Sequence, residues 1–160
     1  MKILALNPDA CTGCRSCEVA CSFAHGKDFS LMDARVNTIN EESRGFTIPT
    51  FCIRCQEKYC QNACPFNAIR IGVLGEILVD EKICTGCKKC LAACPYDGMK
   101  YSLSRKKANA CDLCGGNPQC TRICPTGALQ YVEKNLPIHL KMQTVAMQIK
   151  QIISKRRKKP

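Results

Sequence analysis

Apolar and polar residues alternate over two short stretches in the middle of the chain. The apolar residues recur at every second position before Gly75 and again after it: Ile69, Ile71 and Val73, then Ile77 and Val79. Alternate side chains of a strand point to one face, so period-two alternation broken by a glycine is typical of a β-hairpin. The pattern predicts a hairpin over residues 69–79.

A different period governs the C-terminal segment. After Pro137, apolar residues are spaced by four, three, four and three positions: Ile138, Met142, Val145, Ile149 and Ile152. This spacing predicts one apolar face of a helix, with Pro137 in its first turn, followed by the basic tail "SKRRKKP". The stripe fits three roles: packing on the helix's own domain, docking of a partner subunit, or binding to a membrane surface.

Strand-like stretches also occur near both ends of the remaining chain. "KILALN" begins at residue 2, and "PTGALQYVE" ends at residue 133. Between residues 22 and 51, "ARVNTI" alternates like a strand and "RGFTIPTF" reads as an extended arm. We expect this connecting segment to cover a site or to meet a partner.

Cysteine makes up sixteen of the 160 residues, and the sixteen form four groups with none left over. The groups are Cys11, Cys14, Cys17, Cys21; Cys52, Cys55, Cys60, Cys64; Cys84, Cys87, Cys90, Cys94; and Cys111, Cys114, Cys120, Cys124. The first and third have the spacing C-x2-C-x2-C-x3-C, and the other two widen only the middle gap. All but the first end in Cys-Pro. This is an internal repeat.

Three closely spaced cysteines followed by a fourth is the ligand pattern of a 4Fe-4S cluster. Zinc sites instead take two separated C-x2-C pairs, and disulfides need an oxidising compartment. Residues 1–10 lack the apolar region of a signal peptide, and no stretch has the roughly 18 apolar residues of a membrane-spanning helix. The sequence predicts a cytoplasmic protein with four 4Fe-4S clusters; zinc and disulfides are the weaker alternatives.

The formal net charge of +11 is typical of nucleic-acid binding only if the cysteines are neutral. Sixteen thiolates carry −16 and four oxidised cluster cores of +2 carry +8, which would reduce +11 to +3. The basic side chains then compensate for anionic cofactors, and we expect no nucleic-acid partner.

The second and third groups, joined by the predicted hairpin, resemble a complete two-cluster bacterial ferredoxin. The first and fourth groups carry one strand-like arm each, so the resemblance implies a second, split unit around the first. The fold class implied is α+β with two nested ferredoxin-like units and a C-terminal helix. We expect an outer unit at 1–21 and 105–133, a connecting insertion at 22–45, an inner unit at 46–104, and the helix and tail at 134–160.

In two-cluster ferredoxins the fourth cysteine of a run binds the other cluster. By analogy, one inner cluster would be held by Cys52, Cys55, Cys60 and Cys94, and the other by Cys84, Cys87, Cys90 and Cys64. The outer clusters would be held by Cys11, Cys14, Cys17 and Cys124, and by Cys111, Cys114, Cys120 and Cys21. Cys21 lacks a following proline, which we attribute to the chain leaving there for the long connection.

The nested arrangement resembles the four-cluster iron–sulfur subunits of molybdenum and tungsten oxidoreductases and hydrogenase-linked complexes. The words "FCIRCQEKYCQNACP" and "ACDLCGGNPQC" are most similar to the small subunit of tungsten-dependent aldehyde ferredoxin oxidoreductases. The resemblance implies a non-catalytic electron-transfer subunit between a large catalytic subunit and a ferredoxin or a flavin/NAD subunit. Alternatives are a free polyferredoxin shuttle, or the same role in a hydrogenase, formate dehydrogenase or CO dehydrogenase complex.

Overall fold

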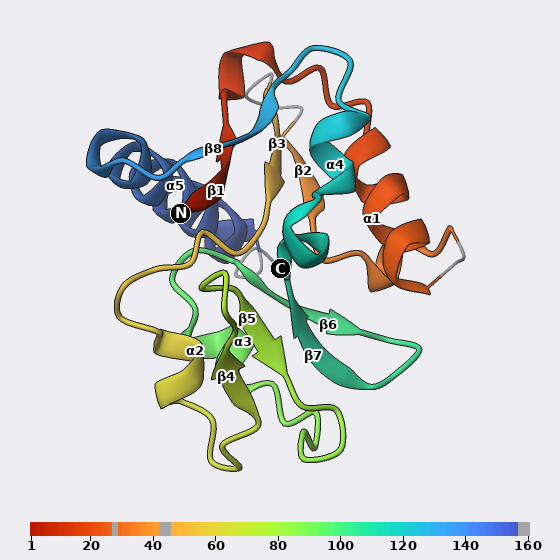
Figure 1. Cartoon of the computed structure of the whole chain (residues 1–160), viewed down its shortest axis with the longest axis vertical. Coiled ribbons are helices and arrows are strands. Elements are labelled where there is room, and N and C mark those ends of the chain that lie inside the picture. The colour runs from red at the N-terminus through yellow and green to blue at the C-terminus, as the bar shows by residue number, and fades with distance from the viewer. Residues whose placement is uncertain (27–28, 42–45, 157–160) are drawn as a thin grey trace.

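The computed structural model describes residues 1–26, 29–41 and 46–156 of the chain. It mixes short helices with short antiparallel strands, which confirms the α+β class (Figure 1). In chain order the elements are β1 (Lys2–Leu6), η1 (Pro8–Ala10), α1 (Ser16–Gly26), η2 (Leu31–Asp33), β2 (Asn37–Glu41), β3 (Phe46–Thr50), α2 (Tyr59–Asn62), β4 (Ile69–Ile71), β5 (Ile77–Val79), α3 (Lys89–Ala93), β6 (Met99–Ser102), β7 (Lys107–Ala110), η4 (Leu113–Gly116), α4 (Gln119–Arg122), β8 (Leu129–Glu133) and α5 (Leu136–Arg156).

The predicted central hairpin is present as the β4–β5 pair. Ile69 lies opposite Val79, and Ile71 lies opposite Ile77. Ile69 and Ile77 are both buried, so one face of the hairpin contributes to the core. Gly75 has a left-handed backbone, with φ of +75°, as the turn between the two strands requires.

The two strand-like arms at the ends of the cysteine region pair with each other. β1 is antiparallel to β8, with Leu6 opposite Leu129 and Lys2 opposite Glu133. Helix α1 packs against α4 beside this pair (Figure 1). The predicted pairing of the arms is confirmed. The division of the chain into two nested units remains a prediction, and the β1–β8 pair agrees with it.

Two further strand pairs lie on either side of the expected inner unit in the sequence. β2 pairs with β3, and β6 pairs with β7 (Figure 1). The expected unit boundaries, after residues 45 and 104, both lie between the paired strands of these hairpins. The sequence did not predict β6 and β7, because each strand is only four residues long.

Hydrogen bonds from buried polar side chains join strands that belong to different strand pairs. Arg54, only 5% exposed, donates from Nη1 to the Leu74 carbonyl at 2.5 Å and from Nη2 to the Lys2 carbonyl of β1. Lys100 of β6 donates from Nζ to Thr50 Oγ1 of β3 at 2.7 Å. These bonds satisfy cations that burial would otherwise destabilise.

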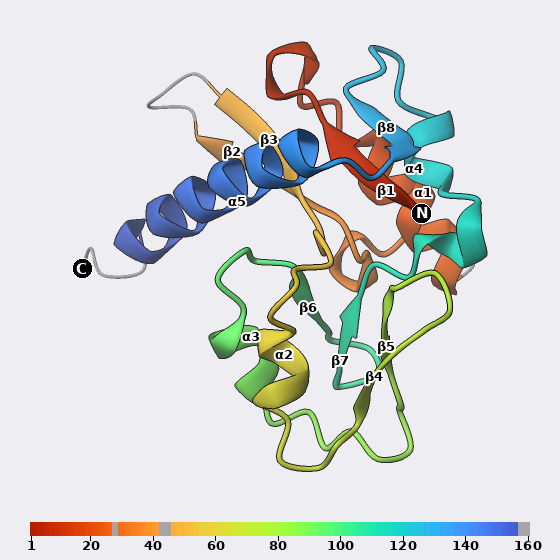
Figure 2. The same ribbon diagram turned by 60° about the vertical axis from the view of Figure 1, so that its left-hand side comes forward.

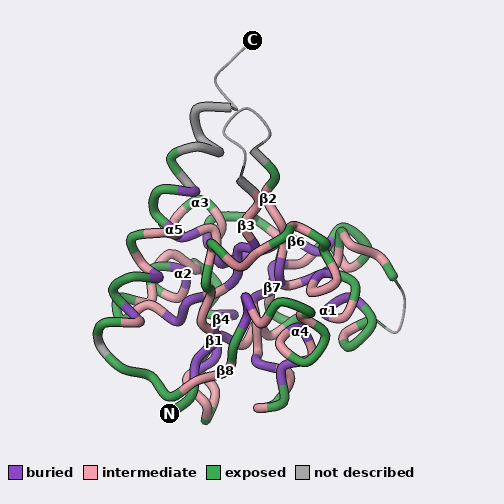
Figure 3. Tube along the Cα trace, turned by 90° about the horizontal axis from the view of Figure 1, so that it is seen from above, coloured by how far each residue is buried: buried purple, intermediate pink, exposed green. Residues whose placement is uncertain are grey.

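The C-terminal helix forms as predicted, and α5 packs on the domain itself. Figure 2 shows α5 crossing beside β1 and β8, and Figure 3 shows the buried positions along one of its sides. Met142 and Ile149, both from the predicted stripe, are 8% and 3% exposed. Among the described residues, no helix is long and apolar enough to cross a membrane. Residues 157–160 of the basic tail lie outside the described residues.

Replacing Ile149 by alanine should destabilise the protein by about 2–5 kcal/mol, because a buried side chain is removed and a cavity remains. Met147 is 46% exposed on the same helix, so Met147→Ala should change the free energy of unfolding by less than about 0.5 kcal/mol. Denaturant unfolding of the two variants measures the difference. Equal effects would contradict the packing of α5 described above.

Candidate metal centres

All four cysteine runs begin with the same backbone feature. The third residue of each C-x2-C loop has a left-handed backbone, with φ between +53° and +72°: Gly13, Arg54, Gly86 and Leu113. This conformation costs a residue with a side chain about 1–2 kcal/mol. Glycine avoids the cost in two runs. The side chains of Arg54 and Leu113 are instead buried, which offsets it.

Three small cavities are each lined by four cysteines. We call these cysteines sets A, C and D. Set A is Cys11, Cys14, Cys17 and Cys124; set C is Cys52, Cys55, Cys60 and Cys94; set D is Cys84, Cys87, Cys90 and Cys64. Each cavity combines three cysteines of one run with the fourth of another run, as the expected ligand sets do.

The remaining four cysteines, Cys21, Cys111, Cys114 and Cys120, are called set B. Burial, followed by the charges of Cys21 and Cys114, raises the pKa of Cys120 to about 12. Burial also raises the pKa of Cys111 well above its ordinary value, and Cys120 and Cys21 add to the rise. These thiols therefore lie close enough to affect one another. That sets A to D bind metal remains a prediction.

The donor chemistry of the four sets fits a 4Fe-4S cluster. Burial, the largest cause, raises the pKa of Cys17 and Cys60 to about 11 and that of Cys52 to about 12. Groups of buried thiols lose their protons only if cations replace them, and cluster iron supplies that charge. The cavities of sets A, C and D are lined by four sulfur donors and by no histidine or carboxylate, whereas His25 and Asp112 lie beside Cys114 of set B.

Backbone amides stabilise the fourth cysteine of each run. Ala68 N–H donates to Cys64 Sγ at 3.4 Å, and Gly98 N–H donates to Cys94 Sγ at 3.2 Å. Each donor lies four residues after its cysteine, across the Cys-Pro turn. Burial of Cys124 acts to raise its pKa, but hydrogen bonds from the backbone after it, including that of Ala128, lower the pKa. Amide donors of this kind tune the potential of a bound cluster.

Cys21 is held differently, which accounts for its missing proline. Helix α1 continues for five residues past Cys21 and ends at Gly26, so no Cys-Pro turn forms. The amide that reaches Cys21 Sγ comes from Arg35, at 3.2 Å, in the connecting segment. The connection therefore supplies the contact that the turn provides in the other three runs.

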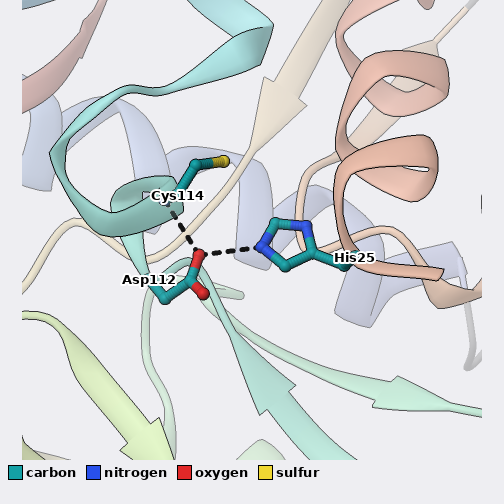
Figure 4. Close-up of side chains that lie close together, drawn as sticks. All are labelled: His25, Asp112 and Cys114. Atoms are coloured by element: carbon teal, nitrogen blue, oxygen red, sulfur yellow. Dashed lines mark hydrogen bonds and ion pairs between the residues drawn. The ribbon is translucent and has the colours of Figure 1, made fainter. Parts of the chain in front are cut away.

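His25 closes the end of α1 beside set B (Figure 4). Its Nδ1 lies 2.7 Å from the Cys21 carbonyl oxygen, and its Nε2 lies 2.9 Å from Asp112 Oδ1. The hydrogen bond to Asp112, then those to Cys114 and Cys21, raise the pKa of His25 to about 12. The contact with Asp112 favours the protonated, cationic form of His25 next to set B.

Asp112 is the centre of this network. It accepts from Cys114 N–H at 3.0 Å and pairs with Arg35 as well as His25. Burial opposes its ionisation, but His25 and Arg35 keep the pKa of Asp112 well below its usual value. Ligand atoms of His25, Asp112 and Cys114 lie within 4.8 Å of one another. We read them as one polar support for set B, because Cys114 already belongs to that set.

Neighbouring sets are also close to one another. Cys17 of set A contributes to the raised pKa of Cys120 in set B. Cys52 of set C does the same for Cys111 of set B. Burial and then Cys60 of set C raise the pKa of Cys90 in set D to about 11. The order of the sets through the molecule is therefore A, B, C, D.

The connecting segment covers set A. Thr38 and Pro49, from the two strands of the β2–β3 hairpin, line the set A cavity. Glu18 of α1, which is fully buried, accepts from Thr38 N–H and pairs with Arg15 Nε at 2.7 Å. The sequence did not reveal Glu18, because a glutamate between two cysteines reads as an exposed helical residue.

Comparison with known families agrees with the donor chemistry. A family model described as "4Fe-4S dicluster domain" matches residues 44–134, more than half of the chain. The chain belongs to the 4Fe-4S dicluster family. A second model, a 4Fe-4S binding domain, matches residues 8–24, which contain the first run.

Curated relatives of this dicluster chain include iron–sulfur subunits of oxidoreductases. The polyferredoxin-like subunit of the aliphatic sulfonate oxidoreductase of Pyrococcus furiosus is 37% identical over 85 residues, covering 52% of this chain and 49% of that protein. The formate dehydrogenase iron–sulfur subunit of Wolinella succinogenes is 32% identical over 79 residues, covering 48% of this chain and 40% of that protein. The chain spans about half the length, or less, of these relatives.

The whole dicluster chain is also similar in fold to a solved structure. A chain of the active site complex BamBC of benzoyl coenzyme A reductase, in complex with benzoyl-CoA, has a TM-score of 0.54. The match is 21% identical and covers 99% of this chain and 98% of that chain. At this identity the likeness concerns the fold alone.

Gly86→Ala should destabilise the protein more than Gly115→Ala. Both glycines have a left-handed backbone, with φ of +72° and +65°, so both variants lose about 1–2 kcal/mol. A Cβ on Gly86 would also collide with the backbone carbonyl of Lys106, whereas one on Gly115 meets nothing within 4 Å. Thermal unfolding and iron retention of anaerobic preparations measure the difference. Equal losses would exclude the close approach at Gly86.

His25→Gln should lower the reduction potential of one cluster by roughly 60 mV, the value for a tenfold change in a one-electron equilibrium. A positive charge beside set B stabilises the reduced cluster, which is the more negative of its two states. The variant loses this charge, so the reduced state becomes less favourable. The matched control is His139→Gln in α5. His139 lines none of the cysteine cavities, so this variant should leave all potentials unchanged. Potentiometric titration followed by EPR measures both. An unchanged potential in His25→Gln would contradict the cationic state of His25.

Proposed function

We propose that the chain is an electron-transfer subunit that carries four 4Fe-4S clusters, one in each of sets A to D. The observation that supports it best is the order A, B, C, D, in which each set has a close neighbour. Of the sixteen cysteines, all of which the structure describes, only Cys14 of set A and Cys87 of set D are exposed. The two ends of the series therefore reach the surface.

Each cluster, when bound, accepts and releases one electron at a time. The protein's own residues would hold the clusters by sixteen thiolates and donate amide hydrogen bonds to the sulfurs. The chain commits all its cysteines to these sets, and within the described residues the close group of Cys114, His25 and Asp112 has its cysteine in set B. We assign it a non-catalytic role.

The catalytic step would take place in a larger partner subunit. The relatives named above are subunits of oxidoreductases, which supports this arrangement. The finer proposal is a tungsten or molybdenum pterin aldehyde oxidoreductase, which rests on the resemblance of the residues around the cysteine runs. The second electron partner would be a ferredoxin or a flavin/NAD subunit. We place the protein in the cytoplasm, where reducing conditions favour cysteine as a metal ligand.

Metal analysis and co-purification test this function. Anaerobically prepared protein should contain about sixteen irons and sixteen sulfides per chain. Zinc, or far fewer irons, would overturn the proposal. Protein from its native source should elute with a large catalytic subunit; elution as an 18 kDa-class monomer at every ionic strength would favour the free polyferredoxin shuttle instead.

Cys124→Ser tests which runs share a cluster. It should release the set A cluster, so that Cys11, Cys14 and Cys17 become open to alkylation, while set D keeps its metal. The matched variant Cys94→Ser should release Cys52, Cys55 and Cys60 instead. Mass spectrometry of alkylated, anaerobic protein identifies the freed cysteines. Release of Cys84, Cys87 and Cys90 by Cys124→Ser would show that runs three and four share a unit, contrary to our proposal.

A further inference from the structure

The two ends of the series have the same local structure. Cys14 and Cys87 occupy the same position in two "CTGC" loops, and the preceding residues, Gly13 and Gly86, have φ of +71° and +72°. The loops lie toward opposite ends of the long axis of the molecule (Figure 1). The two exposed cysteines are therefore equivalent in backbone, and only their surroundings distinguish them.

The charges around the two loops differ. In residues 8–20, around Cys14, Arg15 is the one basic residue, and it pairs with buried Glu18 at 2.7 Å. The loop around Cys87 instead has lysines on both sides: Lys82, Lys88 and Lys89. All three are exposed. Of the two loops, the one around Cys87 is thus the more basic.

A second basic segment lies against the Cys87 loop. The segment "LSRKK" comprises the turn between β6 and β7 and the first residue of β7, and it contains Arg105, Lys106 and Lys107. Lys107 donates from Nζ to the Cys84 carbonyl, and the backbone of Lys106 lies directly against Gly86. Residues 80–90 and 103–107 therefore form one surface, which we call the basic rim.

Few acidic groups oppose the basic rim. Its own acidic residues are Asp80 and Glu81, against six basic ones, and Asp33 of η2 also reaches the rim, where it accepts from Ser104 N–H at 3.4 Å. Glu81 pairs with Arg105 at 3.4 Å, and Asp80 accepts from the backbone N–H of Lys82 at 2.9 Å. Lys88 lies over the Tyr101 ring at 4.3 Å, which leaves its charge in place. The rim remains positive although the adjacent cluster would be anionic.

From this asymmetry we infer that the basic rim is the docking surface for a small acidic electron-carrier protein, which exchanges electrons with set D at Cys87. Complementary charge around an exposed redox centre raises the rate of encounter by about 10–1,000-fold, and the effect falls with salt. Charges at a rim act mainly on the association rate and on orientation. This inference rests on the proposed function, because it assigns one partner to one end of the series.

Carbodiimide cross-linking tests the surface without requiring electron flow. The probe is a purified, acidic flavodoxin, whose carboxylates would be joined to lysines of the intact, cluster-loaded protein. Cross-links should concentrate on Lys82, Lys88, Lys89 and Lys106. Cross-links concentrated on lysines elsewhere, such as Lys134 and Lys141, would overturn the inference, as would the absence of any cross-link at low ionic strength.

Charge reversal tests the kinetic consequence. Lys82→Glu/Lys89→Glu should slow the oxidation of reduced flavodoxin by the protein at least tenfold at low salt, and the difference should vanish at high salt. The control Lys134→Glu/Lys141→Glu carries the same change of net charge away from the rim. Equal slowing by both double variants, or no slowing, would overturn the docking surface.

Reduction by the one-electron-reduced radical cation of methyl viologen separates the two proposals. This small molecule needs no docking surface, so at high salt it should pass its electron to the clusters of all variants at similar rates and return to the dication. Failure of viologen to reduce the wild-type protein would refute the electron-transfer function itself. Normal reduction by viologen, combined with flavodoxin rates that are equal in the two double variants, would refute the basic rim alone.

Discussion

The placement of the fourth cysteine of each run away from the first three is the constraint on which the rest of the structure depends. In sets A, C and D this cysteine lines a cavity built by another run. The chain must turn sharply inside every run and then cross to the partner run. Left-handed residues and Cys-Pro turns provide those changes of direction. Helices α2, α3 and α4 are only four or five residues long as a result.

Such short elements leave little room for a continuous apolar core, so hydrogen bonds from buried polar side chains also hold the elements in place. Glu18 fixes α1 to β2, Arg54 joins β1 to the β4–β5 turn, and Lys100 joins β6 to β3. Each of these groups has hydrogen-bond partners, as burial of a charge demands. Their removal one at a time would leave a partner unsatisfied, so they specify how the two halves fit together.

The sequence predicted the features that depend on spacing. Cysteine intervals gave the four runs, alternation gave the β4–β5 hairpin, and the spacing after Pro137 gave α5. It did not predict the β6–β7 hairpin, because "MKYS" and "KANA" alternate over only four residues each, the shortest run that indicates a strand. Nor could it predict the His25–Asp112 contact, which joins residues 87 positions apart. Contacts of that kind depend on tertiary packing, which local pattern does not encode.

The pairing of β1 with β8 has a consequence for synthesis of the protein. Lys2 leaves the ribosome early, whereas its partner Glu133 follows 131 positions later. At roughly 5–20 residues per second, this interval lasts on the order of ten seconds. The first cysteine run is therefore synthesised well before Cys124, the fourth cysteine of set A. The second and third runs emerge close together, with the hairpin between them. All four cysteines of set D are therefore synthesised before the last cysteine of set A. Iron delivered during translation would find sets D and A complete at different times.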